Sequence, residues 1–186
     1  VPATIGIIIL GEPMVRLFFQ RGAFDELATS MTTSALIFYS IGLIGSALRM
    51  MLNRVYYSFQ DTKTPMRNGA LAVGLNIILN LILMKSMGHG GLALATSISA
   101  TFTTILLFIG LRMRLGPIGL TSYIGSFIKT LFASIIMGIV VYGIFYGLTP
   151  KLPIYGIVEP LMLLFSVGIG VTVYFGLCFI LGIGRI

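Results

Sequence analysis

The segment FQDTKTPMRNG, residues 59–69, is a polar island between two long apolar runs. The run before it, about 27–51, and the run after it, about 69–87, are each long enough to cross the hydrocarbon core of a bilayer, which takes about 20 helical residues. Three charged residues lie within the island. The pattern predicts a loop at a membrane surface that joins two transmembrane helices.

The composition of the 186-residue chain also indicates a membrane protein. Hydrophobic residues make up 57% of it and charged residues 9%, against about 25% charged in a soluble domain. The mean hydropathy is +1.05. A soluble fold of this size has too little interior for so much apolar surface, because most of its own surface faces water. The single cysteine, Cys178, lies in an apolar run and allows no internal disulfide.

Three further apolar runs follow, at about 91–111, 123–148 and 158–181. The chain opens with VPATIGIIIL, which is too short to span a bilayer and lacks the charged start of a signal peptide. We interpret it as the end of a helix whose beginning lies outside the sequence. Residues 11–26, GEPMVRLFFQRGAFDE, have the pattern of a short interfacial helix. We therefore expect an all-α membrane bundle of about six transmembrane helices, one partial, forming the C-terminal piece of a longer protein.

The distribution of basic residues predicts the orientation, because loops rich in Lys and Arg stay on the cytoplasmic side. One side has eight basic residues opposed only by Asp61: Arg49, Arg54, Lys63, Arg67, Arg112, Arg114, Lys129 and Arg185. The other has Arg16, Arg21, Lys85 and Lys151, opposed by Glu12, Asp25, Glu26 and Glu159. We expect the 59–69 loop and the C-terminus in the cytoplasm. The net charge of +7 then reflects orientation and anionic lipid rather than nucleic acid.

Three segments, RVYYSFQDTKTP, GEPMVRLFFQRGAFD and ALIFYSIGLIGSALRMMLNR, have a recognisable order and spacing. Together they resemble the MurJ/MviN family of lipid II flippases, within the multidrug/oligosaccharidyl-lipid/polysaccharide exporter superfamily. RVYYSFQDTKTP, residues 54–65, is similar to the signature after that family's tenth helix. GEPMVRLFFQRGAFD, residues 11–25, is similar to the segment after its ninth helix, and ALIFYSIGLIGSALRMMLNR, residues 35–54, to its tenth. The resemblance implies a fourteen-helix, two-lobed transporter. Residues 1–113 would be part of its C-lobe, and residues 114–186 its final helix pair.

The resemblance also implies a function in bacterial cell-wall synthesis. Such proteins export lipid II, the undecaprenyl-linked peptidoglycan precursor, across the cytoplasmic (inner) membrane by alternating access. The implied partners are this precursor, membrane lipids, the N-terminal lobe of the same protein and the cell-wall synthesis machinery, with Na⁺ or H⁺ as coupling ion and no other cofactor. Two alternatives stay open: a flippase of another polyprenyl-linked glycan, and a membrane scaffold of the same fold that no longer transports.

The first group of candidate functional residues is the signature loop: Arg54, Asp61, Thr62, Lys63, Thr64 and Pro65. Threonine followed by proline is a helix start, so Thr64 is expected to cap the next helix, with Pro65 at its first helical position. Arg54 and Asp61 are expected to fix the loop as a charge pair or a cap.

A second group is a candidate cation site. Asn76 and Asn80 are four residues apart and share a helix face. The resemblance implies that they, Thr96 and the backbone carbonyl of Leu92 match ligands of a sodium ion between helices seven, eleven and twelve. This chain has asparagine at 80, where a carboxylate can occur, and does not include helix seven. The alternative is a hydrogen bond between helices, because a buried amide in hydrocarbon is costly unless paired.

The last two groups of candidate functional residues are expected to contact lipid. Arg49 either extends to the headgroups or faces the cavity and holds phosphate. The resemblance implies a groove for the lipid tail on the last two helices, at Phe127, Phe132, Phe145, Phe165, Tyr174 and Phe175. The alternative for these is ordinary lipid-facing surface. No catalytic constellation or metal-ligand spacing is found, so a transporter is expected rather than an enzyme.

Overall fold

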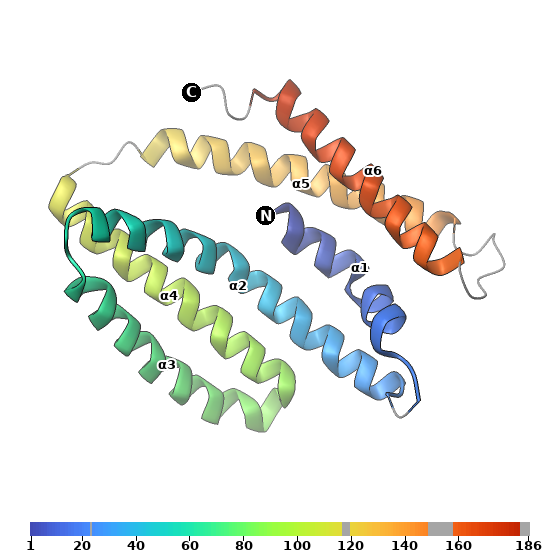
Figure 1. Ribbon diagram of the computed structural model, residues 1–186, viewed down its shortest axis with the longest axis horizontal. Coiled ribbons are helices and arrows are strands. Elements are labelled where there is room, and N and C mark those ends of the chain that lie inside the picture. The colour runs from blue at the N-terminus through green and yellow to red at the C-terminus, as the bar shows by residue number, and fades with distance from the viewer. Residues whose placement is uncertain (23, 117–119, 149–157, 183–186) are drawn as a thin grey trace. The chain divides into compact units, whose positions relative to one another are not determined.

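The described part of the chain is all α-helical, as expected. A computed structural model describes residues 1–22, 24–116, 120–148 and 158–182, without the side chains of 120–124 and 148. Its helices are α1 (Pro2–Phe19), α2 (Glu26–Ser58), α3 (Lys63–Met87), α4 (His89–Leu115), α5 (Leu120–Leu148) and α6 (Val158–Ile180) (Figure 1). All six include a stretch long and apolar enough to cross a membrane. The prediction of about six spans is confirmed.

The helices belong to two compact units, which we describe separately. Unit 1 comprises Val1–Ser30 and Gly119–Ile186, and so contains α1, the first turns of α2, α5 and α6. Unit 2 comprises Met31–Ile118, and so contains the rest of α2 with α3 and α4. Each unit has its own cluster of buried hydrophobic side chains.

In unit 2, α3 and α4 form an antiparallel hairpin that turns at Gly88. Gly88 has φ 56°, a left-handed conformation that glycine adopts at little cost. Its N–H donates to the Met84 carbonyl at 3.1 Å, which closes the last turn of α3. On the α4 side, a Cβ at Gly91 would collide with the Leu83 carbonyl. The absence of side chains at Gly88 and Gly91 therefore lets the end of α3 and the start of α4 approach closely.

Small residues hold α2 against α4. A Cβ at Gly42 would lie 2.7 Å from the Cα of Ser97, so only glycine fits at this crossing. The Ser97 hydroxyl donates to the Phe38 carbonyl at 2.6 Å, and the Thr104 hydroxyl donates to the Gly45 carbonyl at 2.7 Å. Close backbone approach with hydroxyl-to-carbonyl bonds is a typical way for helices to associate in lipid, where apolar surface alone gives little driving force.

Tyr56 anchors the other end of the same interface. Its side chain is fully buried with Leu107 and Leu111, and its hydroxyl donates to the Leu107 carbonyl at 2.8 Å. A Cβ at Gly110 would lie 2.6 Å from the Tyr56 hydroxyl oxygen, so the glycine leaves the space that the hydroxyl occupies. The phenol thus satisfies its polar group inside the unit while its ring fills the core.

In unit 1, α1 packs against both α5 and α6, which also pack against each other. Their shared core consists of Leu10, Met137, Val141, Phe145 and Leu163. Close contacts at two glycines bring the backbones together: a Cβ at Gly138 would meet the Ile5 side chain, and one at Gly170 would meet the Val141 side chain.

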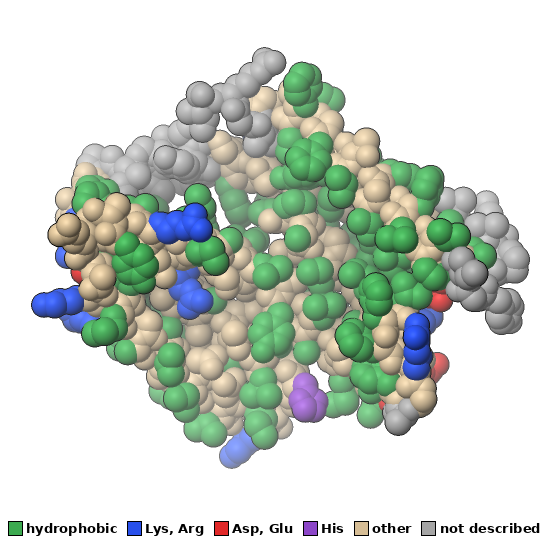
Figure 2. Space-filling view, viewed as in Figure 1, with side chains coloured by type: hydrophobic (Ala, Val, Ile, Leu, Met, Phe, Trp, Pro, Cys, Tyr) green, Lys and Arg blue, Asp and Glu red, His purple; other side chains and the backbone are tan. Residues whose placement is uncertain are grey.

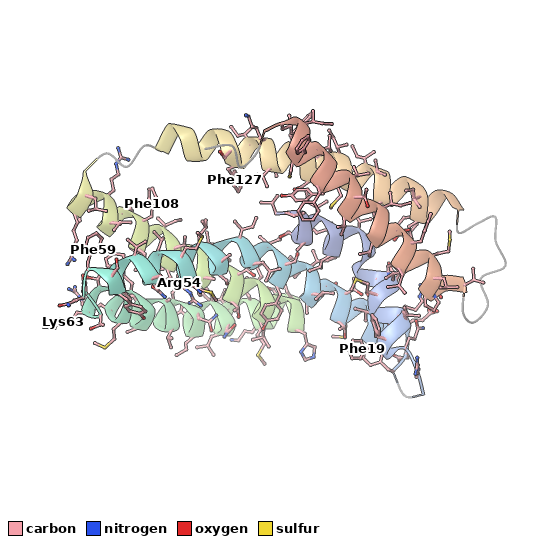
Figure 3. The ribbon with its side chains drawn as sticks, turned by 45° about the horizontal axis from the view of Figure 1, so that its top comes forward. Phe19, Arg54, Phe59, Lys63, Phe108 and Phe127 are labelled. Atoms are coloured by element: carbon pink, nitrogen blue, oxygen red, sulfur yellow. The ribbon has the colours of Figure 1, made fainter. Side chains whose placement is uncertain are left out.

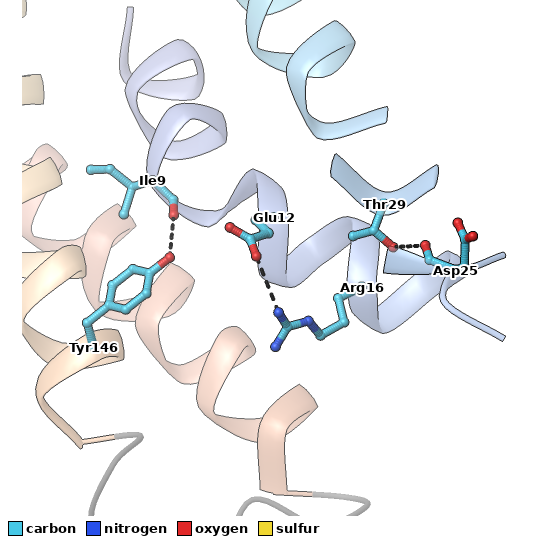
Figure 4. Close-up of polar contacts among 6 residues, drawn as sticks. All are labelled: Ile9, Glu12, Arg16, Asp25, Thr29 and Tyr146. Atoms are coloured by element: carbon cyan, nitrogen blue, oxygen red, sulfur yellow. Dashed lines mark hydrogen bonds and ion pairs between the residues drawn. The ribbon is translucent and has the colours of Figure 1, made fainter. Parts of the chain in front are cut away.

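Helix α1 does not stop where the sequence suggested. We expected a separate interfacial helix over residues 11–26, but α1 continues to Phe19 with Pro13 inside it, so this expectation is wrong. Proline removes the N–H that would bond to the carbonyl of Ile9. The Tyr146 hydroxyl of α5 donates to that carbonyl at 3.5 Å, a long hydrogen bond (Figure 4). Packing against α5 and this contact offset part of the loss, so the helix passes through the proline.

The outer surface of the helices is mostly apolar. Large hydrophobic side chains are exposed on every helix, and they cover much of the face shown in Figure 2. A soluble monomer rarely exposes so much contiguous apolar area. The surface is therefore suited to lipid or to further transmembrane helices.

Candidate functional site

The signature loop begins with a tightly closed end of α2. The Asp61 N–H donates to the Tyr56 carbonyl at 3.0 Å, and the Gln60 N–H donates to the Tyr57 carbonyl at 2.9 Å. Gln60 has φ 56°. This pair of bonds around a left-handed residue is a Schellman motif, which satisfies the last carbonyls of a helix. The motif brings Asp61 directly to the start of α3.

Asp61 ties this loop to both neighbouring helices. Its carboxylate accepts the Thr64 N–H at 3.0 Å and the Thr64 hydroxyl at 2.7 Å, and it forms an ion pair with Arg114 of α4 at 2.7 Å. The Asp61 side chain is 12% exposed and that of Arg114 is 53% exposed. The hydrogen bonds from Thr64, with a smaller contribution from Arg114, lower the pKa of Asp61 below its ordinary value. The carboxylate is therefore held in its charged form.

Two details of the loop differ from expectation. Helix α3 begins at Lys63 after Thr62, and Asp61 supplies the side-chain cap. The assignments of Thr64 as the capping residue and of Pro65 as the first helical residue are therefore wrong. Thr64 instead donates to that cap. Asp61 pairs with Arg114, while Arg54 makes no ion pair within the described residues. Asp61 thus acts as a cap. Figure 3 shows Arg54, Phe59 and Lys63 at this end of unit 2.

Substituting Asp61 should change how the stability of the complete protein depends on pH. A lowered pKa means that the carboxylate stabilises the fold above its ordinary pKa of 3.8 and loses this effect as pH falls through the lower folded value. We expect Asp61→Asn to have a lower melting temperature than wild type at pH 7. The gap should narrow as pH falls below 3.8 and the wild-type carboxylate, whose folded pKa is lower, takes up its proton.

The measurement is the melting temperature of both proteins from pH 7 down to the lowest pH at which the wild-type protein stays folded. Glu12→Gln is the control, because Glu12 belongs to an exposed ion pair with Arg16 within α1 (Figure 4) and exposed pairs contribute little. A gap between wild type and Asp61→Asn that stays constant over the whole range would contradict the role of the carboxylate charge.

The candidate cation residues form two hydrogen-bonded pairs on the α3–α4 hairpin. The Asn80 Nδ2 donates to the Asn76 Oδ1 at 3.0 Å, and the Thr96 hydroxyl donates to the Leu92 carbonyl at 3.0 Å. The Asn80 Oδ1 is buried and has no hydrogen-bond partner within the described residues. The first hydrogen bond lies within α3 and the second within α4, so neither is the hydrogen bond between helices that was the alternative. All four candidate groups carry an oxygen atom, and none is a carboxylate. Oxygen-only ligands suit a hard cation, and the unpartnered Asn80 oxygen is an acceptor that such a cation would satisfy.

Arg49 lines a cavity inside unit 2 of about 260 Å³, together with Asn53 of α2, Gly69 of α3 and Thr103 of α4. This cavity lies within one unit, so whether Arg49 reaches the headgroups or faces the transport cavity stays a prediction. The Asn53 Oδ1 is buried without a hydrogen-bond partner within the described residues.

Unit 1 contains an apolar cavity between α1, α5 and α6, with a volume of about 320 Å³. Its lining is apolar side chains and glycine, and includes Pro2, Gly6, Val141, Val171, Tyr174 and Phe175. Two of the six predicted groove residues, Tyr174 and Phe175, therefore lie on it. Phe145 is instead buried in the core of the unit, and Phe127, Phe132 and Phe165 are exposed on the surface.

Lys129 has a role that the sequence reading missed. Its Nζ donates to the backbone carbonyl of Leu181, just beyond the C-terminus of α6, at 3.2 Å. A cation near the last carbonyls of a helix is favourable, because those carbonyls lack partners and carry the negative end of the helix dipole. The sequence signal for this contact is a lysine in the first half of α5, because the C-terminus of the next antiparallel helix, α6, lies beside that part of α5.

A family model described as lipid II flippase MurJ matches residues 1–165. The chain belongs to the MurJ family. Its relatives include the probable lipid II flippase MurJ of Rickettsia prowazekii (strain Madrid E), 32% identical over 97% of this chain and 36% of the relative. The probable lipid II flippase MurJ of Vibrio cholerae serotype O1 is 41% identical over 61% of this chain and 22% of the relative.

A solved structure described as lipid II flippase MurJ in an inward closed conformation is also similar. It superposes with a TM-score of 0.79 at 30% identity, covering 97% of this chain and 35% of that one. The chain therefore spans about a third of the length of the MurJ structure that it matches. The predicted family, the all-helical membrane fold and the multi-pass character are confirmed. MurJ proteins are flippases, so the expected class of transporter rather than enzyme is confirmed as well.

Proposed function

We propose that this chain is the C-terminal part of a lipid II flippase that exports the undecaprenyl-linked peptidoglycan precursor by alternating access. The observation that carries the proposal is the MurJ family match over residues 1–165. In a fourteen-helix, two-lobed protein, residues 1–113 would belong to the C-lobe and residues 114–186 would be the final helix pair. The partners would be the lipid-linked precursor, the N-terminal lobe and the cell-wall synthesis machinery.

The proposed location is the bacterial cytoplasmic membrane, with the 59–69 loop and the C-terminus in the cytoplasm. The excess of Lys and Arg at the Asp61 end supports this orientation. The ion pair and cap at Asp61 would then hold the cytoplasmic ends of α2, α3 and α4 together while the lobes move. In this proposal the signature loop keeps these three helix ends in a fixed arrangement within the lobe.

The apolar cavity of unit 1 is the proposed seat of the lipid tail. It has the size and lining to accept a segment of a polyprenyl chain, and Tyr174 and Phe175 contribute aromatic surface to it. Burial of each methylene group is worth about 0.8 kcal/mol, so even a short buried segment stabilises binding. Phe127, Phe132 and Phe165, which are exposed, would extend this apolar surface.

The amide pair on the hairpin is the proposed site of the coupling cation, Na⁺. Asn76, Asn80, Thr96 and the Leu92 carbonyl supply oxygen ligands, and the unpartnered Asn80 Oδ1 supports the proposal. If it is right, Na⁺ raises the melting temperature of the complete protein relative to K⁺, and Asn80→Leu removes the difference. Equal melting temperatures of the wild-type protein in both salts would refute the site and leave H⁺ as the candidate.

The function is tested by export in living cells. The complete protein is expressed in bacteria depleted of their own lipid II flippase, and lipid II in the outer leaflet is measured. Restored export is expected. Absence of export from a well-inserted protein would reject lipid II as the substrate, and would favour either another polyprenyl-linked glycan or a non-transporting scaffold.

A pair of variants in the same assay tests the tail cavity. Val171→Trp adds a large ring at a residue that lines the cavity, whereas Leu164→Trp adds the same ring at a residue of α6 outside its lining, and both positions are exposed. Excluding two methylene groups of the tail should weaken binding about tenfold, so export should fall with Val171→Trp alone. Equal export by the two variants at equal expression would exclude this cavity as the seat of the tail.

A further inference from the structure

The cavity at Arg49 has no role in the function proposed above. It lies wholly within unit 2, between α2, α3 and α4, and measures about 260 Å³. Its polar wall is formed by Ser46, Arg49 and Asn53 of α2 and by Thr103 of α4, with Gly69 of α3 leaving room on the opposite side. In contrast to the apolar cavity of unit 1, it presents a charged side chain and several polar atoms to one small space.

The cavity lies within reach of the membrane surface at the Asp61 end of the unit. Arg49 is nine residues before the end of α2, and Gly69 is six residues after the start of α3. At 1.5 Å per residue these positions lie about 14 and 9 Å along their helices from the loop. A lipid phosphate at the interface and a long arginine side chain can meet at this depth.

The polar atoms of the cavity define what would fit it. Arg49 is the one charged lining residue, and within the described part of the chain it has no ion pair. The Asn53 Oδ1 is buried without a partner. The Thr103 hydroxyl donates to the Ser99 carbonyl at 2.8 Å, so toward the cavity it can only accept. The site therefore offers one positive charge, two acceptor oxygens and the Ser46 hydroxyl, which can donate or accept.

A matching ligand carries one negative charge and at least one hydroxyl donor. A phosphodiester linked to a small polyol has this combination, because its phosphate accepts from the guanidinium while its hydroxyl donates to the amide or threonine oxygen. An arginine within a membrane-spanning helix is costly unless it is paired or hydrated, which such a ligand achieves. We propose that this cavity binds a polyol phosphodiester, as in the headgroup of phosphatidylglycerol.

The same chemistry is available from lipid or from water, so the experiment separates the two sources. The complete protein is purified, stripped of lipid and titrated with short-chain phosphatidylglycerol, with phosphatidylcholine and with soluble glycerophosphoglycerol, which is the same headgroup phosphodiester without acyl chains. Native mass spectrometry reports binding. We expect phosphatidylglycerol to bind in preference to phosphatidylcholine. Comparable binding of glycerophosphoglycerol would assign the site to a soluble ligand of the same class.

Two arginine variants form the matched comparison. Arg49→Gln should weaken phosphatidylglycerol binding about tenfold, the loss expected for a charge-assisted hydrogen bond. Arg67→Gln removes the same charge from an exposed position on the first turns of α3, outside the cavity, and should leave binding unchanged. If Arg49→Gln does not fold, Asn53→Asp is used, because its carboxylate would repel the phosphate.

Two results would overturn the inference. Equal weakening by Arg49→Gln and Arg67→Gln would mean that lipid binds the basic surface without using the cavity. A loss of stability in Arg49→Gln with unchanged lipid binding would mean that Arg49 pairs with a carboxylate elsewhere in the complete protein. The inference uses only one part of the proposed function, namely that the complete protein lies in a membrane. Phosphatidylglycerol binding is measured without lipid II, so a failure of this binding can be distinguished from a failure of lipid II export.

Discussion

Gly42→Val should separate α2 from α4 and destabilise the complete protein by about 3 kcal/mol, with Gly42→Ala costing about 1–2 kcal/mol. The glycine lies against Ser97 so closely that an added Cβ would fall 2.5 Å from its hydroxyl oxygen and 2.7 Å from its Cα. The backbone atom cannot rotate away, so the helices must move apart. Movement would also stretch the bonds from Ser97 and Thr104 to carbonyls of α2.

The measurement is the free energy of unfolding in mixed micelles, obtained by titration with SDS. Gly74→Val is the matched control, because a Cβ at Gly74 of α3 meets nothing within 4 Å. Its effect should stay within about 0.5 kcal/mol. If Gly42→Val is as stable as Gly74→Val, then α2 and α4 do not approach as closely as described.

Tyr56→Ala is expected to cost about 4 kcal/mol, because it removes a fully buried aromatic ring and leaves a cavity next to Leu107. Tyr56→Phe keeps the ring and removes only the hydroxyl bond to the Leu107 carbonyl, so its cost should be about 1 kcal/mol. The ratio of the two effects distinguishes packing from hydrogen bonding.

The adjacent Tyr57 provides the control for this series. Its side chain is 53% exposed, so Tyr57→Ala should change the free energy of unfolding by about 0.5 kcal/mol at most. The same SDS titration measures all three variants. Comparable losses for Tyr56→Ala and Tyr57→Ala would show that Tyr56 is not the anchor of the α2–α4 contact.

The lengths of the apolar runs in the sequence predicted the number and positions of most helices. The apolar runs correspond to α2 through α6 within a few residues at most ends, because a helix is the simplest way to satisfy backbone groups in lipid. The four-residue spacing of Asn76 and Asn80 correctly predicted that they share a face, where their amides are now hydrogen bonded. Such local features depend on helix geometry, which the sequence displays directly.

Contacts between distant segments were not predictable in the same way. Arg54 is close to Asp61 in sequence, yet the ion-pair partner of Asp61 is Arg114. Arg114 lies near the C-terminus of α4, which reaches the same end of unit 2 as the 59–69 loop. The continuation of α1 through Pro13 depends on packing against α5, which the local pattern does not contain. The spacing of Gly42 and Gly45, with Ser97 and Thr104 later in the chain, was a readable signal for a tight helix crossing.

The turn of α1 between Ile9 and Pro13 has a mechanical consequence. It lacks one main-chain hydrogen bond, and the 3.5 Å contact from Tyr146 is too long to restore full stiffness. The helix therefore behaves as two rigid rods joined by one compliant turn, with α5 attached beside the joint. Bending of α1 concentrates at this joint, and the Tyr146 contact is the first to lengthen when the rods change their angle.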